Sequence, residues 1–363
     1  MTYLNAVGVK QPRPAGDRQG LAWLTLAGLT VLLLGAAFVS LATGASGTSF
    51  FNLVAAAIGD PSANVEQLQR DQVVVMAIRL PRLVLGVLVG AALAVSGAVM
   101  QGLFRNPLAD PGLVGISSGA ALGAVSIIVL GTTVLAPITA IFGIYALQVA
   151  AFGGGLVTTI ILYQVATRHG QTAVATMLLA GIALAALAMA VTGVLIFVAD
   201  DQQLRDLTFW NLGSLSGANW TKVTASGTII ILALAATPFL ARGLNGMTLG
   251  EATAAHMGVP LQAFKRVAIV TVAAATGAAV AVSGGIGFVG IVVPHLLRLV
   301  IGPDHRFLLP ASAMLGAAFL LLADAVSRVV VAPAELPIGI VTAFVGGPFF
   351  LWILLRKRGS LGW

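Results

Sequence analysis

The stretch from Arg79 to Ala120, RLPRLVLGVLVGAALAVSGAVMQGLFRNPLADPGLVGISSGA, decides what kind of fold to expect. After Arg82 about twenty residues pass without a charge, which is the length that an α-helix needs to cross the hydrocarbon core of a bilayer. The apolar run ends at residues 106–111, NPLADP, where two prolines force irregular backbone. Irregular backbone at membrane depth is tolerated only where protein or a water-filled cavity surrounds it. The stretch therefore predicts one wall and the gate of a pathway, with an ordinary helix–turn–helix as the alternative.

The composition is that of a membrane protein built from many helices. Of 363 residues, 58% are hydrophobic and 9% are charged, and the mean hydropathy is +1.02. These values exclude a soluble domain of this length. The 43 glycines are typical of helices that pack closely through small residues. Because the chain has no cysteine, it can form neither a disulfide nor a thiolate metal site.

Ten apolar runs predict ten transmembrane helices in an all-α, polytopic fold. The runs cover residues 21–43, 82–103, 113–131, 134–165, 172–197, 222–241, 262–284, 286–301, 308–327 and 337–355. The predicted membrane domain is therefore 21–355, with tails at 1–20 and 356–363.

The distribution of positive charge predicts the orientation in the bilayer. With the N-terminus in the cytoplasm, thirteen lysines and arginines fall on the inside and six on the outside. Positive charge concentrates on the cytoplasmic side of membrane proteins, so both termini are predicted to be cytoplasmic. The same bias accounts for most of the net charge of +7, and no nucleic-acid partner is needed to explain it.

A short repeat indicates an inverted architecture. Gly90 to Gly97 reads GAALAVSG and Gly277 to Gly284 reads GAAVAVSG, so seven of eight residues agree. Such a match is partly chance in a chain rich in Gly and Ala. The two copies nevertheless lie in predicted spans that cross in opposite directions, and inverted repeats around a central pathway are common in transporters.

The longest predicted inside loop, residues 245–266, contains LGEATAAHMG between residues 249 and 258. This pattern predicts a short helix between two glycines, and Gly258 can end it in a left-handed conformation. A surface hairpin is the alternative. The outside segment 44–78 is long enough for another short helix, FFNLVAAAIG.

Several long motifs resemble one family over nearly the full length of the chain, the permeases of ABC importers for iron siderophores, heme and cobalamin. The matching stretches are RLPR, GAALAVSGAVMQGLFRNPLADPGLVGISSGA, FWNLGSLSGANW, LGEATAAHMGV, GFVGIVVPHLLRL and AELPIGIVTAFVGGPFFLWIL. The resemblance implies a multi-pass protein of the bacterial inner membrane that forms a homodimer. Two ATP-binding subunits would bind on the cytoplasmic side and a periplasmic substrate-binding protein on the other.

The resemblance also implies roles for individual residues. Docking of the binding protein falls to Arg79, Arg82 and Arg328. The cytoplasmic gate maps to Asn106, Pro107 and Leu108 and to Ala175 and Thr176, although segment 172–176 has fewer hydroxyls than the cobalamin branch. Coupling to the ATPase maps to Gly250, Glu251, Ala255, His256 and Gly258, within the predicted coupling segment 245–266.

Within the family, the segments DDQQLR at 200–205 and VAPAELP at 331–337 resemble the heme permeases most. The resemblance therefore implies heme as the substrate. His169, His256, His295 and His305 all fall at predicted inside ends or loops, so heme would meet no histidine ligand before it exits. We expect heme as a transported substrate, no permanently bound cofactor and no metal site. A ferric siderophore or cobalamin is the alternative cargo.

Two other classes of membrane protein fit the sequence less well. No Walker motif is present, so we expect no enzyme activity in this chain, and ATP hydrolysis would belong to a partner. An ion-coupled secondary transporter would need buried acids at mid-membrane, and only Asp324 lies near a span interior. A membrane enzyme would need clustered His, Asp or Glu at membrane depth, which the sequence does not offer.

Overall fold

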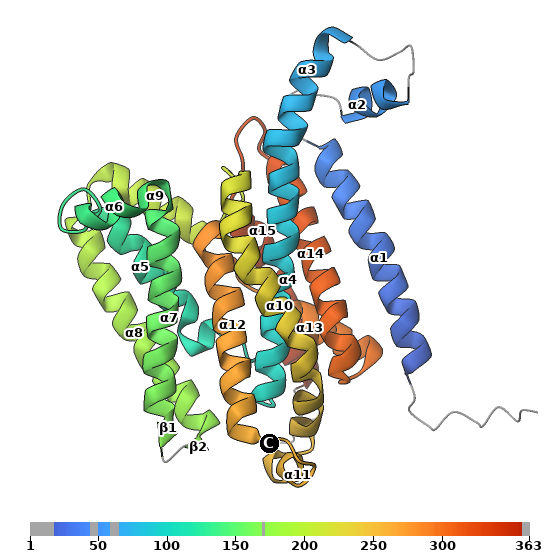
Figure 1. Cartoon of the computed structure of the whole chain (residues 1–363), viewed down its shortest axis with the longest axis vertical. Coiled ribbons are helices and arrows are strands. Elements are labelled where there is room, and N and C mark those ends of the chain that lie inside the picture. The colour runs from blue at the N-terminus through green and yellow to red at the C-terminus, as the bar shows by residue number, and fades with distance from the viewer. Residues whose placement is uncertain (1–17, 44–49, 59–64, 169–170, 358–363) are drawn as a thin grey trace, which may run out of the picture.

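The computed structural model describes residues 18–43, 50–58, 65–168 and 171–357. Its helices stand side by side in one bundle, with α2 and α3 at one end and α11 at the other (Figure 1). The helices are α1 (Gln19–Ala42), α2 (Phe50–Ala57), α3 (Val65–Val74), α4 (Leu80–Leu103), α5 (Ile116–Leu130), α6 (Ala136–Phe142), α7 (Ala146–Ala166), α8 (Val174–Val198), α9 (Asp201–Leu212), α10 (Trp220–Thr248), α11 (Glu251–His256), α12 (Leu261–Ser283), α13 (Val289–Ile301), α14 (His305–Val329) and α15 (Ile338–Lys357).

Ten of these helices correspond to the ten predicted apolar runs. Seven are long and apolar enough to cross a membrane, and three shorter apolar helices cover 116–130, 289–301 and 338–353. The short helix α13 has 13 residues with Pro294 inside it, and about 20 residues are needed for a full crossing. A helical membrane protein is therefore confirmed, whereas ten crossings and cytoplasmic termini stay predictions. Most of the predicted tails, residues 1–17 and 358–363, lie outside the described residues.

The structure corrects the predicted start of the second span. Residues 67–103 form one helical rod of 37 residues, in which α3 runs through a π-helical turn, Val75–Arg79, into α4. Pro81 has no N–H to donate to the preceding turn, and a π-turn is a way of accommodating such a break. The motif RLPR at 79–82 thus lies inside a continuous helix, whereas the predicted span began at residue 82. The short helix predicted in 44–78 is present as α2.

Helix α4 lies at the centre of the bundle, and glycines let its neighbours approach its backbone. All positions from Val89 to Phe104 are buried. A Cβ on Gly90 would overlap the carbonyl of Gly316 in α14, and a Cβ on Gly97 would overlap that of Gly290 in α13. These contacts bring the backbones together without side chains between them.

The two copies of the repeat lie on α4 and α12, which pack against each other. Figure 1 shows that α4 runs from the α3 end toward the α11 end, whereas α12 begins beside α11 and runs back. The opposite directions that the sequence predicted for these two helices are therefore present.

Two details at the α11 end differ from the sequence prediction. Helix α10 continues to Thr248 and α12 begins at Leu261, so only 249–260 of the predicted loop 245–266 separates them. Strands β1 (Thr167–Arg168) and β2 (Gln171–Thr172) pair antiparallel between α7 and α8, with Thr167 opposite Thr172. This hairpin is a small exception to the predicted all-α fold.

We predict that Gly97→Ala destabilises the protein by about 1–3 kcal/mol, the usual effect of overpacking a tight contact. The new methyl would overlap the carbonyl oxygen of Gly290. The matched control is Gly28→Ala in α1, where a Cβ would meet nothing within 4 Å. Thermal unfolding of the detergent-purified variants measures both, and equal melting temperatures for the two would contradict the prediction.

Candidate functional site

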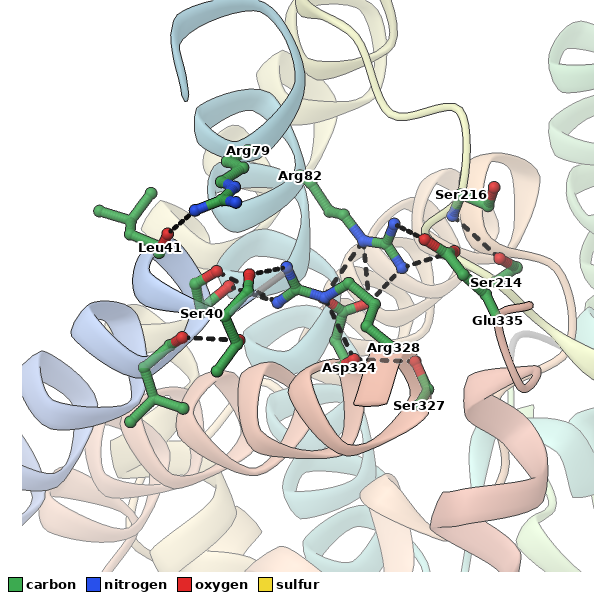
Figure 2. A network of polar contacts seen from close by, with 12 residues as sticks. Ser40, Leu41, Arg79, Arg82, Ser214, Ser216, Asp324, Ser327, Arg328 and Glu335 are labelled. Carbon is green, nitrogen blue, oxygen red and sulfur yellow. Dashed lines mark hydrogen bonds and ion pairs between the residues drawn. The ribbon is translucent and has the colours of Figure 1, made fainter. Parts of the chain in front are cut away.

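At the α3 end, three arginines converge on two acids and on the last turn of α1. Arg79 lies in the π-turn, Arg82 in the first turn of α4 and Arg328 in the last turn of α14. Only 5%, 8% and 6% of their surfaces are exposed, respectively. Asp324 lies one helical turn before Arg328, and Glu335 lies between α14 and α15. Figure 2 shows the cluster.

Arg82 forms ion pairs with both acids. Its Nη2 and Nε lie 2.9 and 3.0 Å from Asp324 Oδ1, and its Nη1 lies 2.9 Å from Glu335 Oε1. A second contact, from Nη2 to Glu335 Oε2, measures 3.0 Å. The planar guanidinium has enough donors to bind two carboxylates at once, which an ammonium group matches less well. Arg82 therefore ties α4 to α14 and to the segment before α15.

The other two arginines hold the carboxyl end of α1. Arg328 Nε lies 3.1 Å from Asp324 Oδ2, while its Nη1 donates to the carbonyl of Thr43 at 2.9 Å. Arg79 Nη1 donates to the carbonyl of Leu41 at 2.6 Å. The last carbonyls of a helix have no partner within the helix and carry partial negative charge, so guanidinium groups there supply hydrogen bonds and favourable electrostatics.

The predicted docking arginines are thus brought together, but within the fold and not as open cations on a rim. Each has acceptors inside the chain, and Asp71 of α3 also interacts electrostatically with Arg79. Glu335 is the more accessible member, with 37% of its side chain exposed. Binding-protein docking stays a prediction for these residues. The structure adds a second role that the sequence did not reveal, because the arginines connect α1, α4 and α14. The sequence signal for the ion pair between Asp324 and Arg328 was their four-residue spacing.

We predict that Asp324→Asn destabilises the protein by about 3–5 kcal/mol, because it leaves buried guanidinium groups without their shared carboxylate. The control, Glu335→Gln, removes a partly exposed acid and should change stability by less than about 1 kcal/mol. Melting temperatures of the two variants in one detergent provide the comparison. Equal losses would show that burial of Asp324 has no special weight.

At the α11 end, the predicted gate loop forms a tight polar turn after α4. Asn106 Oδ1 accepts a hydrogen bond from Leu108 N at 3.0 Å, which stabilises the turn. Arg105 just before it has a φ of 49°, in the left-handed region. Asp110 Oδ1 accepts from Gly112 N at 2.8 Å and caps the short 3₁₀ helix Pro111–Val114. Burial raises the pKa of the Asp110 carboxyl above its ordinary value, and the hydrogen bond from Gly112 offsets this in part.

A cavity of about 200 Å³ adjoins this loop, and Arg105 and Pro107 line it. Three further lining residues carry buried polar atoms for which the described part of the chain supplies no partner, namely Gln101 Oε1, Arg298 Nε and His305 Nε2. Such atoms normally bind protein or ordered water. The loop therefore lies beside a small space suited to water.

The second predicted gate element, Ala175 and Thr176, begins α8, and both residues are exposed. Next to them Met177 is buried in an apolar cluster that also holds Ala109 and Phe104. The residues that flank the two predicted gate elements thus share one cluster.

The predicted coupling helix is confirmed as a helix. It is α11, and it lies between Gly250 with a φ of 107° and Gly258 with a φ of 82°. The left-handed end expected at Gly258 is present. His256 and Ala255 are exposed, so they are accessible from outside the bundle. A role in contact with an ATPase stays a prediction.

One partner of α11 was missed by the sequence. Lys265 of α12, which is 2% exposed, lies 2.8 Å from Glu251 Oε2 and donates to the carbonyl of Thr172 at 3.0 Å. The sequence placed Lys265 only among the inside positive charges. Because Thr172 is 93 positions away, no local spacing could have predicted this contact.

We predict opposite effects for two substitutions of Asp110. Asp110→Ala loses the cap of the 3₁₀ helix and should destabilise by about 1 kcal/mol. Asp110→Asn keeps an oxygen for Gly112 N and removes a carboxylate whose charged form is disfavoured by burial. Because the folded-state pKa is raised, wild-type protein loses stability as pH rises through it, so the advantage of Asn should grow from acid to neutral pH. Melting curves across that range test both, and a pH-independent difference would contradict the assignment.

Comparison with known proteins places these features in a family. The model of the FecCD transport family matches residues 32–356. This chain belongs to the FecCD transport family. The FecCD chain is 50% identical over 281 residues to the hemin transport system permease protein of Yersinia pestis, covering 77% of this chain and 83% of that protein.

Two further relatives are named for cobalamin. A cobalamin import system permease protein of Halobacterium salinarum is 46% identical, with 79% and 74% coverage of the two chains. A vitamin B12 import system permease protein of Shigella boydii is 41% identical over 348 residues, with 94% and 97% coverage. A metal-chelate type ABC transporter solved in an inward-facing conformation superposes with a TM-score of 0.79 at 31% identity, covering 91% and 98%.

The FecCD chain is thus the membrane permease subunit of an ABC importer. Importers of this class work with ATP-binding subunits and a substrate-binding protein, which agrees with the predicted division of labour. ATP hydrolysis belongs to the partner subunits.

Proposed function

We propose that this FecCD chain forms the pathway for heme in an ATP-driven importer of a bacterial inner membrane. The observation that carries the proposal is its 50% identity to a hemin permease. The segments DDQQLR and VAPAELP support it as well, because they resemble heme permeases. Cobalamin is the second candidate, favoured by relatives at 46% and 41% identity. A ferric siderophore remains the third.

The described histidines are consistent with a pathway that does not trap heme. His295 packs edge-on against Phe349, with ring centroids 6.1 Å apart. The Nδ1 of His305 lies 2.9 Å from Asn245 Oδ1, and His256 belongs to α11. His295 is thus held by ring packing and His305 by a hydrogen bond, while His256 lies on α11. His169 lies outside the described residues. A transport pathway works best when it binds its cargo weakly enough to release it.

The proposed assembly is a homodimer with two ATP-binding subunits below α11 and a binding protein at the α3 end. In this arrangement α11, including Gly250, Glu251, Ala255, His256 and Gly258, contacts the ATPase. Asn106, Pro107 and Leu108, with Ala175 and Thr176, form the cytoplasmic gate. Arg79, Arg82 and Arg328 lie where the binding protein arrives, and acidic residues of that protein would compete with Asp324 and Glu335 for them.

The test is uptake into liposomes that hold this chain, its ATP-binding subunit and its binding protein. Heme, ferric siderophore and cobalamin are supplied separately, and luminal cargo and ATP hydrolysis are measured together. We expect accumulation of heme that requires ATP and stops when the ATP-binding subunit is inactivated at its hydrolysis site.

Each alternative result has a definite meaning. ATP-dependent uptake of cobalamin or of a siderophore, without heme, would retain the importer and overturn the substrate. Uptake driven by an ion gradient without ATP would overturn the importer itself.

A further inference from the structure

We propose that Lys265 is a positioning residue that connects movement of the coupling helix α11 to the gate at the start of α8. The inference rests on the proposed function, since it takes α11 as the contact with the ATPase. It adds a residue and a route that the family resemblance did not supply, and it is carried by contacts among α11, α12 and β2.

The Nζ of Lys265 makes both connections at once. It lies 2.8 Å from Glu251 Oε2 in α11 and 3.0 Å from the carbonyl oxygen of Thr172 in β2. One helical turn earlier on the same face of α12, Gln262 Oε1 accepts a hydrogen bond from Thr172 N at 2.9 Å. Both polar groups of the Thr172 peptide backbone are therefore held by side chains of α12, and one of those side chains also holds α11.

Thr172 is adjacent to the gate element. Ala173 follows it and is the residue that precedes α8, and the carbonyl of Ala173 accepts the hydrogen bond of Met177 N at 3.0 Å. Ala175 and Thr176 lie within that first turn. A displacement of Glu251 is thus transmitted to the start of α8 through one ammonium group and two short hydrogen bonds.

Stability alone does not explain a lysine at this position. Lys265 is 2% exposed, and desolvating an ammonium group is unfavourable unless the partners are well placed. A buried ion pair is often no more stabilising than apolar side chains of similar volume. A methionine would fill the same space without that desolvation, but it could not bind Glu251 and Thr172 together. The charged group is therefore suited to a connection that must hold while the two elements move.

The neighbouring residue offers a matched control. Arg266 is exposed, and its Nε donates to the hydroxyl of Tyr163 in α7 at 3.3 Å. Tyr163 in turn interacts with the side chains of Thr167 and Thr172, so Arg266 reaches β2 only through Tyr163 and makes no ion pair with Glu251. Lys265→Met and Arg266→Met each remove one positive charge from the first turn of α12. Only the first breaks the connection from Glu251 to Thr172.

The experiment measures cargo accumulated per ATP hydrolysed in liposomes that hold the full complex. The Lys265→Met complex should hydrolyse ATP at about the wild-type rate, while the amount of cargo accumulated per ATP hydrolysed falls at least about fivefold. That factor corresponds to the lower limit of a typical allosteric coupling free energy. Arg266→Met should match wild type in both. An unchanged ratio in Lys265→Met would overturn the proposal. So would a parallel loss of hydrolysis and uptake, because Lys265 would then support the ATPase contact itself.

A second measurement reports on the gate directly and tolerates a loss of yield in the first variant. Because this chain contains no cysteine, Thr176→Cys gives one spin-label site per permease chain, at an exposed position of α8, in a complex whose partner subunits have no reactive cysteine. In the otherwise wild-type complex the spectrum should differ between the nucleotide-free state and the ATP-bound state. Lys265→Met should remove that difference, and Glu251→Gln, which keeps a neutral acceptor, should reduce it. A spectral change that persists in both variants would overturn the connection.

The two hypotheses fail in different ways. Wild-type complex that shows no ATP-dependent uptake of heme, siderophore or cobalamin contradicts the proposed function. A wild-type complex that transports, together with a Lys265→Met complex of equal efficiency, contradicts only the role of Lys265.

Discussion

The close backbone contacts of α4 are the constraint on which the rest of the structure depends. Gly97 meets Gly290 of α13 and Gly90 meets Gly316 of α14, with no side chain between the helices. In lipid, helices gain little from burying apolar surface against each other, so packing at such contacts supplies much of the association. A fixed separation of α4, α13 and α14 in turn places Arg82 within hydrogen-bond distance of Asp324. The same separation places Gln101 Nε2 within 3.0 Å of the Gly290 carbonyl at the other end.

Buried charge is handled in the same manner at both ends of the bundle. At the α3 end Arg82 binds two carboxylates and Arg328 binds one carboxylate and the end of α1. At the α11 end Lys265 binds a carboxylate and a carbonyl. In each case one cationic group joins elements that are distant in sequence. The buried charges of the bundle thus serve as connections between helices.

The sequence predicted the features that depend on local pattern. The apolar runs located ten helices, and the glycines around LGEATAAHMG predicted α11 and the left-handed Gly258. It failed where distant partners decide the structure. The second span was predicted to begin at residue 82, where the uncharged run starts, but a π-turn lets α3 continue into α4. Arg79, Arg82 and Arg328 were predicted to dock the binding protein, and nothing local shows that α1 and Asp324 surround them. The bond from Lys265 to Thr172 joins residues 93 positions apart.

The rod formed by α3, the π-turn and α4 is longer than a bilayer requires. At about 1.5 Å per residue, its length is roughly 55 Å, against a hydrocarbon core of about 30 Å. A tilt of about 20° shortens its projection only slightly. When its α11 end lies near one face of the membrane, the α3 end therefore projects well beyond the opposite face. A molecule that approaches from that side would meet α3 before it reaches the lipid headgroups, and any force applied there would act on a continuous helical rod whose other end is the predicted gate loop.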